Sequence, residues 1–139
     1  MSEEKKFIMI VDESLPLGLI ANTTAILGNT IGSHYPSAVG KDIIDQNGNS
    51  HLGIIEIPIP ILKGNNKSLK ELRTKLYQEK YKDMIAADFS DIAQSCKTYD
   101  EYITKMSKIN SKDINYFGIA IYGNKKQINK LTGSIGLLK

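Results

Sequence analysis

Apolar and polar positions follow one another in blocks along this chain, and the blocks predict strands that are followed by helices. The run from Phe7 to Val11 is apolar without interruption, which is typical of a central strand covered on both faces. Asp12 and Glu13 end the run, and Pro16 forces the chain to turn before a helix can begin. We expect the rest of the fold to pack around this strand and turn.

A helix is predicted after Pro16, because Ile20, Leu27 and Ile31 recur at helical spacing. A neighbouring stripe of small residues is expected to bring the helix backbone close to the sheet. This stripe consists of Ala21, Ala25, Gly28 and Gly32.

A β-hairpin is predicted in the next segment, because Asn47 and Gly48 stand between two apolar runs, the first from Val39 to Asp45. A calcium loop is the competing interpretation. Asp45, Asn47, Asn49 and Glu56 occupy positions one, three, five and twelve of that pattern. Ser50 replaces the glycine that the loop requires, and no helices flank it, so we favour the hairpin.

The segment from Gly53 to Leu62 alternates isoleucine with other residues and is predicted to be a strand. Pro58 and Pro60 have the same parity, so both remove hydrogen-bond donors from one side of it. The strand, or at least its second half, is therefore expected at an edge of the sheet.

Alternating strands and helices continue to the end of the chain. Capping boxes are predicted at Ser68 with Glu71 and at Thr98 with Glu101. The expected elements are a helix over 68–80, a strand over 84–88, a helix over 98–109, a strand over 116–122, a helix over 125–131 that ends at Gly133, and a last short strand or tail over 134–138. This order predicts one α/β domain over 1–139, with three α/β/α layers and a mixed, mostly parallel sheet of about four strands.

Composition narrows the class of protein. The 139 residues carry a net charge of +3, with −4 through Leu62 and +7 from Lys63 onward. The basic second half is compatible with a phosphate-bearing partner, although solvated lysines explain it as well. The chain has one cysteine, Cys96, so no internal disulfide can form, and we predict a cytoplasmic protein with no membrane segment.

Polar residues at the predicted strand ends are the candidates for chemistry, because ligands of open α/β sheets bind beyond the carboxyl ends of the strands. Asp12 and Glu13 leave the first strand, and Asp88 leaves the 84–88 strand. Asn22, one turn into the first helix, could point into the same crevice. These carboxylates could bind a hard cation or act as acid and base, or they could cap helix starts, where the helix dipole favours negative charge.

Gly123 and Asn124 leave the 116–122 strand and could hold a phosphate at the helix that follows. The glycine spacing matches neither a Walker loop nor a dinucleotide fingerprint. His34 and His51 lie far apart in sequence, and neither forms a catalytic or zinc-binding set with Cys96. We therefore predict neither a metal nor a cofactor.

The two ends of the chain resemble a known family. The segment from Phe117 to Leu138 contains a buried strand, a glycine turn, a short helix and the run Lys130-Leu131-Thr132-Gly133. The opening segment has an apolar strand, the turn at Leu17-Gly18 and an alanine-rich helix. Both are similar to the type-two peptidyl-tRNA hydrolases. Over nearly its full length the chain resembles a small bacterial family of unknown function with the same fold.

The resemblance implies that fold, together with site roles for Gly18, Lys130 and Thr132 beside the strand-end residues. Asp88 matches the strand-end aspartate of the hydrolases, and Asn22 corresponds to their glutamine if a short gap is allowed. Leu19 and Ile20 stand where those enzymes have a lysine, and Ala25 stands near their histidine.

Three functional hypotheses follow from the sequence. The first is a hydrolase that acts on an ester or amide with Asp12, Glu13, Asn22 and Asp88. The second is a non-catalytic module that binds RNA or a small metabolite in the same crevice. The third is an interaction protein that forms a homodimer, joined along the proline edge or through helix faces.

Overall fold

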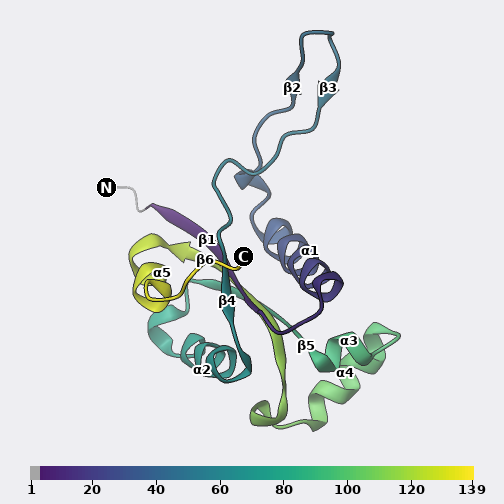
Figure 1. Ribbon diagram of the computed structural model, residues 1–139, viewed down its shortest axis with the longest axis vertical. Coiled ribbons are helices and arrows are strands. Elements are labelled where there is room, and N and C mark those ends of the chain that lie inside the picture. Colours follow the sequence, from purple (N-terminus) through teal and green to yellow (C-terminus); the bar gives the residue numbers. More distant parts are fainter. Residues whose placement is uncertain (1–3) are drawn as a thin grey trace.

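The computed structural model describes residues 4–139, which form a four-stranded mixed sheet with helices on both faces (Figure 1). The strand order is β4-β1-β6-β5. β1 pairs in parallel with β4 and antiparallel with β6, and β6 pairs antiparallel with β5. The strands are β1 (Lys5–Asp12), β4 (Ile61–Gly64), β5 (Ile85–Ser90) and β6 (Tyr116–Asn124).

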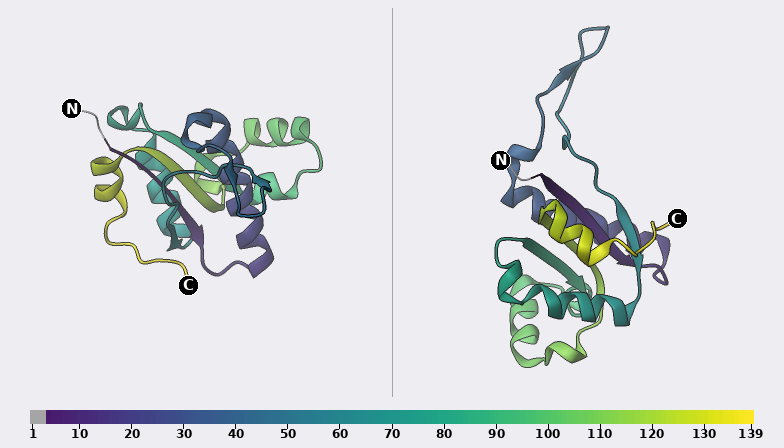
Figure 2. Two further views of the ribbon diagram at one scale, coloured as in Figure 1. Left: turned by 90° about the horizontal axis from the view of Figure 1, so that it is seen from above. Right: turned by 90° about the vertical axis from the view of Figure 1, so that its left-hand side faces the viewer.

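The helices make the two outer layers of a three-layer fold (Figure 2). α1 (Leu17–His34) packs on one face of the sheet, where Leu27 and Ile31 meet Phe7 and Met9. α2 (Asn66–Leu76) and α5 (Lys125–Thr132) cover the other face and meet Ile8 and Ile10 of β1. α3 (Asp91–Ser95) and α4 (Tyr99–Lys108) follow β5, and short 3-10 turns lie at Pro36–Ala38, Glu79–Tyr81 and Ser111–Asp113.

β1 is the central strand that the apolar run predicts. Its residues from Phe7 to Val11 are buried and alternate between the two faces, so the strand contributes to both hydrophobic clusters. The four-stranded mixed sheet is therefore confirmed. The expectation that it is mostly parallel is wrong, because only the β1–β4 pairing is parallel. β6 runs opposite to the other three strands.

Several predicted boundaries require correction. The strand expected over 53–62 is paired in the sheet only from Ile61, and Pro58 and Pro60 precede it. Its position at an edge is confirmed. The helix expected over 68–80 is α2, which ends at Leu76 and is capped by Asn65, whose side chain accepts a hydrogen bond from the backbone N–H of Ser68. Thr98 does cap α4, accepting from the N–H of Glu101.

Most of the small-residue stripe of α1 faces away from the sheet, contrary to the prediction, and only Gly28 meets it, with its added Cβ 3.6 Å from Cε of Met9. Ala21, Ala25 and Gly32 are exposed, whereas Thr23, Leu27 and Ile31 are the buried residues of the helix. The sheet supplies the small residue instead. A Cβ at Gly118 of β6 would lie 2.7 Å from Cγ2 of Thr23, so α1 packs closely against the backbone of β6 there.

The predicted hairpin is confirmed and projects from the body as an arm, which we define as residues 39–57 (Figure 1). β2 (Ile43–Ile44) pairs with β3 (Ser50–His51), and Gly48 adopts a φ of 84°, which favours glycine. Asp45 accepts hydrogen bonds from the N–H groups of Asn47 and Asn49, so it closes the turn. The hairpin interpretation therefore replaces the calcium loop.

Candidate functional site

The predicted site at the end of β1 forms a turn of its own. Asp12 Oδ1 accepts hydrogen bonds from the N–H and the hydroxyl of Ser14, at 2.9 and 2.7 Å. Glu13 is exposed, and its N–H donates to the carbonyl of Gly64. α1 begins after Pro16 without a side-chain cap, so neither carboxylate caps that helix. The Asp12 side chain stabilises the turn that leads out of β1.

Asn22 and Gly18 lie on the exposed side of α1, away from the sheet. Asp88 lies inside β5, because the strand continues to Ser90, and it is level with Ile10 across β6. β1 and β5 are separated by β6 and Asp12 lies two residues beyond Ile10, so the backbones of Asp12 and Asp88 stand about 12 Å apart across the sheet. The structure does not bring these residues into one crevice.

The C-terminal candidates lie at the opposite end of the sheet, since Asn124 pairs with Lys5 at the start of β1. The Asn124 side chain caps α5 by accepting from the N–H of Gln127. Thr132 is buried and donates its hydroxyl to the carbonyl of Ile128, whereas Lys130 is exposed. Gly123 packs against Met84. Gly123 and Asn124 therefore do not join Asp12 at one edge of strand ends, as a parallel arrangement would require, because β6 runs antiparallel to β1.

Asp88 is the one predicted residue that lies in a polar cluster. Arg73 of α2 donates from Nε to Asp88 Oδ2 over 2.8 Å, and the two side chains are only 13% and 15% exposed. The Arg73 guanidinium carbon also lies 4.3 Å from the centre of the Tyr77 ring. The cluster therefore joins the second helical layer to the edge strand of the sheet.

Two tyrosines complete the cluster. Burial raises the pKa of Tyr116 to about 12, and the negative charge of Asp88 contributes in the same direction. Burial also raises the pKa of Tyr102, with a smaller contribution from Asp88. Arg73 opposes both shifts. Both phenols therefore remain protonated at neutral pH and can donate hydrogen bonds.

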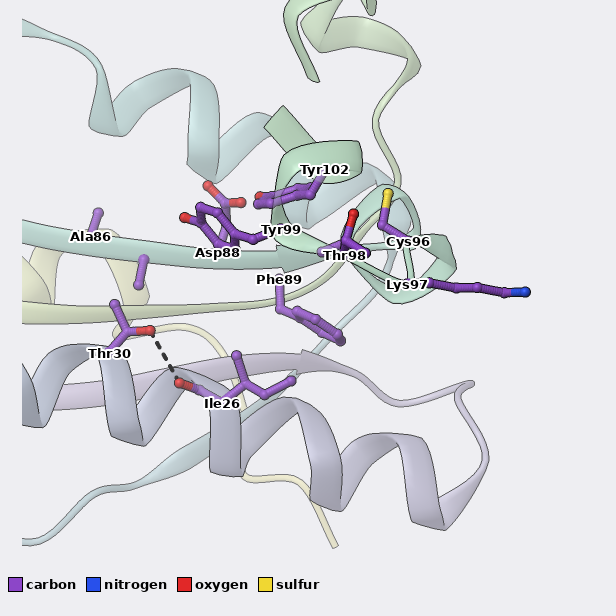
Figure 3. Close-up of a pocket in the computed structure, with 12 residues that line it drawn as sticks. Ile26, Thr30, Ala86, Asp88, Phe89, Cys96, Lys97, Thr98, Tyr99 and Tyr102 are labelled. Atoms are coloured by element: carbon purple, nitrogen blue, oxygen red, sulfur yellow. Dashed lines mark hydrogen bonds between the residues drawn. The ribbon is translucent and has the colours of Figure 1, made fainter. Parts of the chain in front are cut away.

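A crevice of about 530 Å³ runs along β5 between α1 and the α3–α4 segment (Figure 3). Ala86, Ala87, Asp88 and Phe89 of β5 line it. Figure 3 shows Phe89 and Ile26 on the α1 side of the strand, and Asp88 and Tyr102 on the other side. The remaining lining residues are Thr30, Ala93, Cys96, Lys97, Thr98 and Tyr99.

The hydrogen-bond pattern of β1 shows which way the backbone groups of the sheet point. Met9 and Glu13 donate their N–H groups to carbonyls on the β4 side, at 3.0 and 3.1 Å. Backbone groups alternate in direction along a strand, so Ile10 faces β6, where it pairs with Ile119. Ala120, the next residue of β6, must therefore face β5.

The same alternation fixes the open edge of β5. Ala87 pairs with Ala120, so the N–H and C=O groups of Ala87 and Phe89 are directed into the sheet. Those of Ala86 and Asp88 are directed outward, along the crevice. Within residues 4–139, neither residue takes part in a backbone hydrogen bond outside the helices and strands. β5 therefore presents two pairs of unpaired backbone groups beside a crevice.

Sequence reasoning missed Arg73, Tyr102 and this strand edge. Arg73 is the single arginine among the 18 lysine and arginine residues of the chain, and this rarity is the sequence signal that could have identified it. Arginine is favoured over lysine in partly buried ion pairs. The open edge of β5 depends on the order of the strands in the sheet, which cannot be predicted from local sequence.

Two further properties of the described residues bear on the class of protein. No helix within residues 4–139 is long and apolar enough to span a bilayer. No group of three or more histidine, cysteine, aspartate or glutamate residues in that range is arranged to hold a metal ion.

Comparison with known proteins gives two matches. A family model described as "Protein of unknown function (DUF2000)" matches residues 5–139. A solved structure of a protein of unknown function from Agrobacterium tumefaciens strain C58 matches with a TM-score of 0.85 and 18% identity, over 99% of this chain and 98% of that one. No curated protein matches the chain. The predicted resemblance to a family of unknown function is confirmed, and the chain shares its fold with the Agrobacterium protein. Neither match concerns a peptidyl-tRNA hydrolase, so the resemblance to that fold stays a prediction.

Proposed function

Because this chain belongs to the DUF2000 family of proteins of unknown function, we propose a function from its own geometry: it is a non-catalytic module that binds an extended peptide along β5. Peptide binding by strand addition uses the unpaired N–H and C=O groups of an edge strand for affinity and flanking pockets for specificity. The open edge of β5 within the crevice is the observation that carries this proposal.

The opposite edge of the sheet supports the proposal by contrast. The C-terminal tail covers β4, since Lys63 donates its N–H to the carbonyl of Gly136 and Leu138 donates to the carbonyl of Ile61, both over 2.9 Å. Proteins normally cover or blunt exposed strand edges, because unpaired edges attract other chains. This protein covers one edge with its own tail and leaves the other open beside a crevice.

The flanks of the crevice define the chemistry of the peptide. An added strand of about five residues would alternate its side chains between the two sides of the crevice. On the α1 side it would meet Ile26, which is 37% exposed, and Phe89. On the other side it would meet Tyr102 and Tyr99, which is 74% exposed. We therefore expect an aliphatic residue facing Ile26 and a residue that accepts a hydrogen bond facing the tyrosines.

Hydrolysis receives less support from the geometry than binding does. The hydrolase hypothesis, including the peptidyl-tRNA hydrolase-like site, requires Asp12, Glu13 and Asn22 beside Asp88. Asp12 is engaged by Ser14 at another part of the sheet, Asn22 is exposed, and Asp88 is paired with Arg73. Arg73 Nε occupies Asp88 Oδ2, so that oxygen is not free to orient a water molecule for attack.

Selection from a phage-displayed library of random dodecapeptides tests the proposal. The selected peptide is then synthesised, and its affinity is measured by calorimetry. The decisive reagents are versions of that peptide methylated at single backbone nitrogens. Alternate methylations should weaken binding about 10-fold or more, because only every second N–H of an added strand faces β5. Uniform effects along the peptide, or no selected peptide, would contradict strand addition.

A substitution in β5 provides the matching test on the protein side. Ala86→Pro removes the outward N–H without removing a bond to β6, since proline is tolerated on edge strands. We expect it to abolish binding of the selected peptide, whereas the control Ala86→Ser retains the N–H and should bind as the wild type does. If Ala86→Pro does not fold, the methylated peptides still decide the question.

RNA binding is the second candidate, favoured by a separate groove of about 730 Å³ outside α2. Lys70, Arg73, Lys75 and Lys112 line it together with the rings of Tyr77 and Tyr116, although Glu71 also borders it. Cations with aromatic rings are the usual elements of single-stranded nucleic-acid sites. Fluorescence anisotropy with a labelled oligouridine tests this. Affinity that falls steeply between about 50 and 200 mM salt and is lost in Lys75→Glu would support it.

A further inference from the structure

The arm exposes more aliphatic surface than any other segment of the described chain with comparable length. Ile43 and Ile44 near its tip are 64% and 65% exposed, and Leu52 and Ile54 along its shaft are 83% and 79% exposed. Val39 at its base is 47% exposed. An isolated two-stranded hairpin is only marginally stable in water, so an arm with this surface calls for a covering partner.

The arm also stands clear of the domain. Figures 1 and 2 show the strands leaving the end of α1 and extending away from the sheet. The eight residue steps from Val39 to Asn47 give it a length of up to about 25 Å. Ile43 pairs with His51 and Ile44 pairs with Ser50, so the two isoleucines lie on opposite faces of the ribbon. Both faces are therefore available for contact.

A small apolar cavity of about 130 Å³ lies at the root of the arm. Tyr35, Val39, Ile55, Ile59 and Tyr122 are among the residues that line it. Its size is comparable to the apolar cavities of about 150 Å³ that bind benzene, so it can accept an aliphatic side chain. The cavity at the root of the arm is thus apolar, like the side chains at its tip.

We propose that the arm is the dimerisation element of the protein. In a two-fold dimer the arms of two copies lie antiparallel, and Ile44 at the tip of each copy, which shares a face of the ribbon with Leu52 and Ile54, enters the root cavity of the other. A two-fold axis requires that each contact occur twice with the roles of the copies exchanged, and antiparallel arms place tip against root. The contact is independent of the peptide crevice along β5.

The available area fits a second copy that associates in the micromolar range. Ile44, Leu52 and Ile54 share one face of the ribbon, and a fully exposed aliphatic side chain presents on the order of 100 Å², so this face of two arms offers roughly 450 Å². With about 57% of a typical interface being non-polar, this corresponds to about 800 Å² in total, before the contacts at the two root cavities are counted, which is the size of a weak association.

Sedimentation velocity and light scattering on the full chain test the proposal. We expect the measured mass to approach twice that of the 15.4 kDa chain as the protein concentration is raised to roughly 200 µM. This concentration is high enough to detect micromolar association. The double variant Ile43→Ser with Ile44→Ser should be monomeric, with circular dichroism unchanged. Leu17→Ser is the matched control, because Leu17 is 82% exposed outside the arm, and it should remain dimeric.

Disulfide trapping in a Cys96→Ser background tests the tip-to-root arrangement. Ile44→Cys combined with Val39→Cys should yield a covalent dimer upon mild oxidation, whereas Ile44→Cys alone should not. A monomer at the highest concentration, or a dimer that the double serine variant leaves intact, would overturn the proposal. A covalent dimer from Ile44→Cys alone would overturn the tip-to-root arrangement.

Discussion

Arg73 Nε lies 2.8 Å from Asp88 Oδ2, and this hydrogen-bonded ion pair links α2 to the open edge strand β5. Asp88 borders the crevice on β5, and Arg73 borders the basic groove outside α2. The pair therefore forms the wall between the two candidate sites. Its low exposure distinguishes it from the exposed pair between Lys82 and Glu79, whose side chains are 66% and 86% exposed.

Asp88→Ala should destabilise the protein by about 1–3 kcal/mol, because it leaves the largely buried Arg73 without its partner. The double variant Arg73→Met with Asp88→Leu should recover part of that loss, since it removes both charges. Urea unfolding measures both. Glu79→Ala, which breaks the exposed pair, is the control and should cost less than about 0.5 kcal/mol. Equal losses for the two single variants would show that burial adds nothing to the Arg73–Asp88 pair.

The elements of this fold could be predicted where the signal is local. The run from Phe7 to Val11 identifies the central strand, Asn47-Gly48 identifies the hairpin, and Thr98 identifies the start of α4. Each depends on side-chain burial or turn chemistry within a few residues. Pro58 and Pro60 also indicated an edge strand, because a missing N–H is a property of the residue itself.

The candidate site depended on relations that no local pattern contains. The direction of β6 is set by its pairing with β1, and it moved Gly123 and Asn124 to the far end of the sheet from Asp12. The sequence predicts Asp88 at a strand end, whereas β5 continues to Ser90. Arg73, the partner of Asp88, lies 15 residues earlier and makes its position inside the strand tolerable. The outward groups of Ala86 follow only from the full strand order.

Gly118→Ala should destabilise the protein by about 2–3 kcal/mol or prevent folding, because the new methyl group would meet Cγ2 of Thr23 at 2.7 Å and the carbonyl of Ile10 at 3.2 Å. Thr23 cannot easily move, since its hydroxyl donates to the carbonyl of Leu19 over 2.7 Å. Thermal unfolding followed by circular dichroism measures the effect. Gly18→Ala is the control, since no atom lies within 4 Å of its added methyl group, and it should be neutral or slightly stabilising. A Gly118→Ala protein as stable as the wild type would show that α1 can shift away from the sheet.

Gly53→Ala should disorder the arm and leave the domain folded. A Cβ at Gly53 would overlap the carbonyl group of Gly40, where the two halves of the arm cross. Gly53 also donates its N–H to Asp42 Oδ1 over 2.9 Å, and that bond would be lost. Hydrogen exchange should increase at the amides of Asp45 and Asn49 and remain unchanged in β1. Lys41→Ala, an exposed substitution on the same arm, is the control. Protection of the arm that survives in Gly53→Ala would contradict the close crossing.

Alkaline pH should reduce stability through Tyr116. Burial, followed by the charge of Asp88, raises its pKa in the folded protein to about 12, against 10.0 for a free tyrosine. Between these values the unfolded chain has lost the phenolic proton and the folded protein has kept it. The contribution to stability is therefore fully present below about pH 10 and is lost as pH rises toward 12.

Urea unfolding at a series of pH values should show this loss in the wild type and a smaller loss in Tyr116→Phe. Tyr99→Phe, which removes an exposed tyrosine, is the control and should follow the wild type. An identical pH dependence in Tyr116→Phe would assign the alkaline loss to other groups.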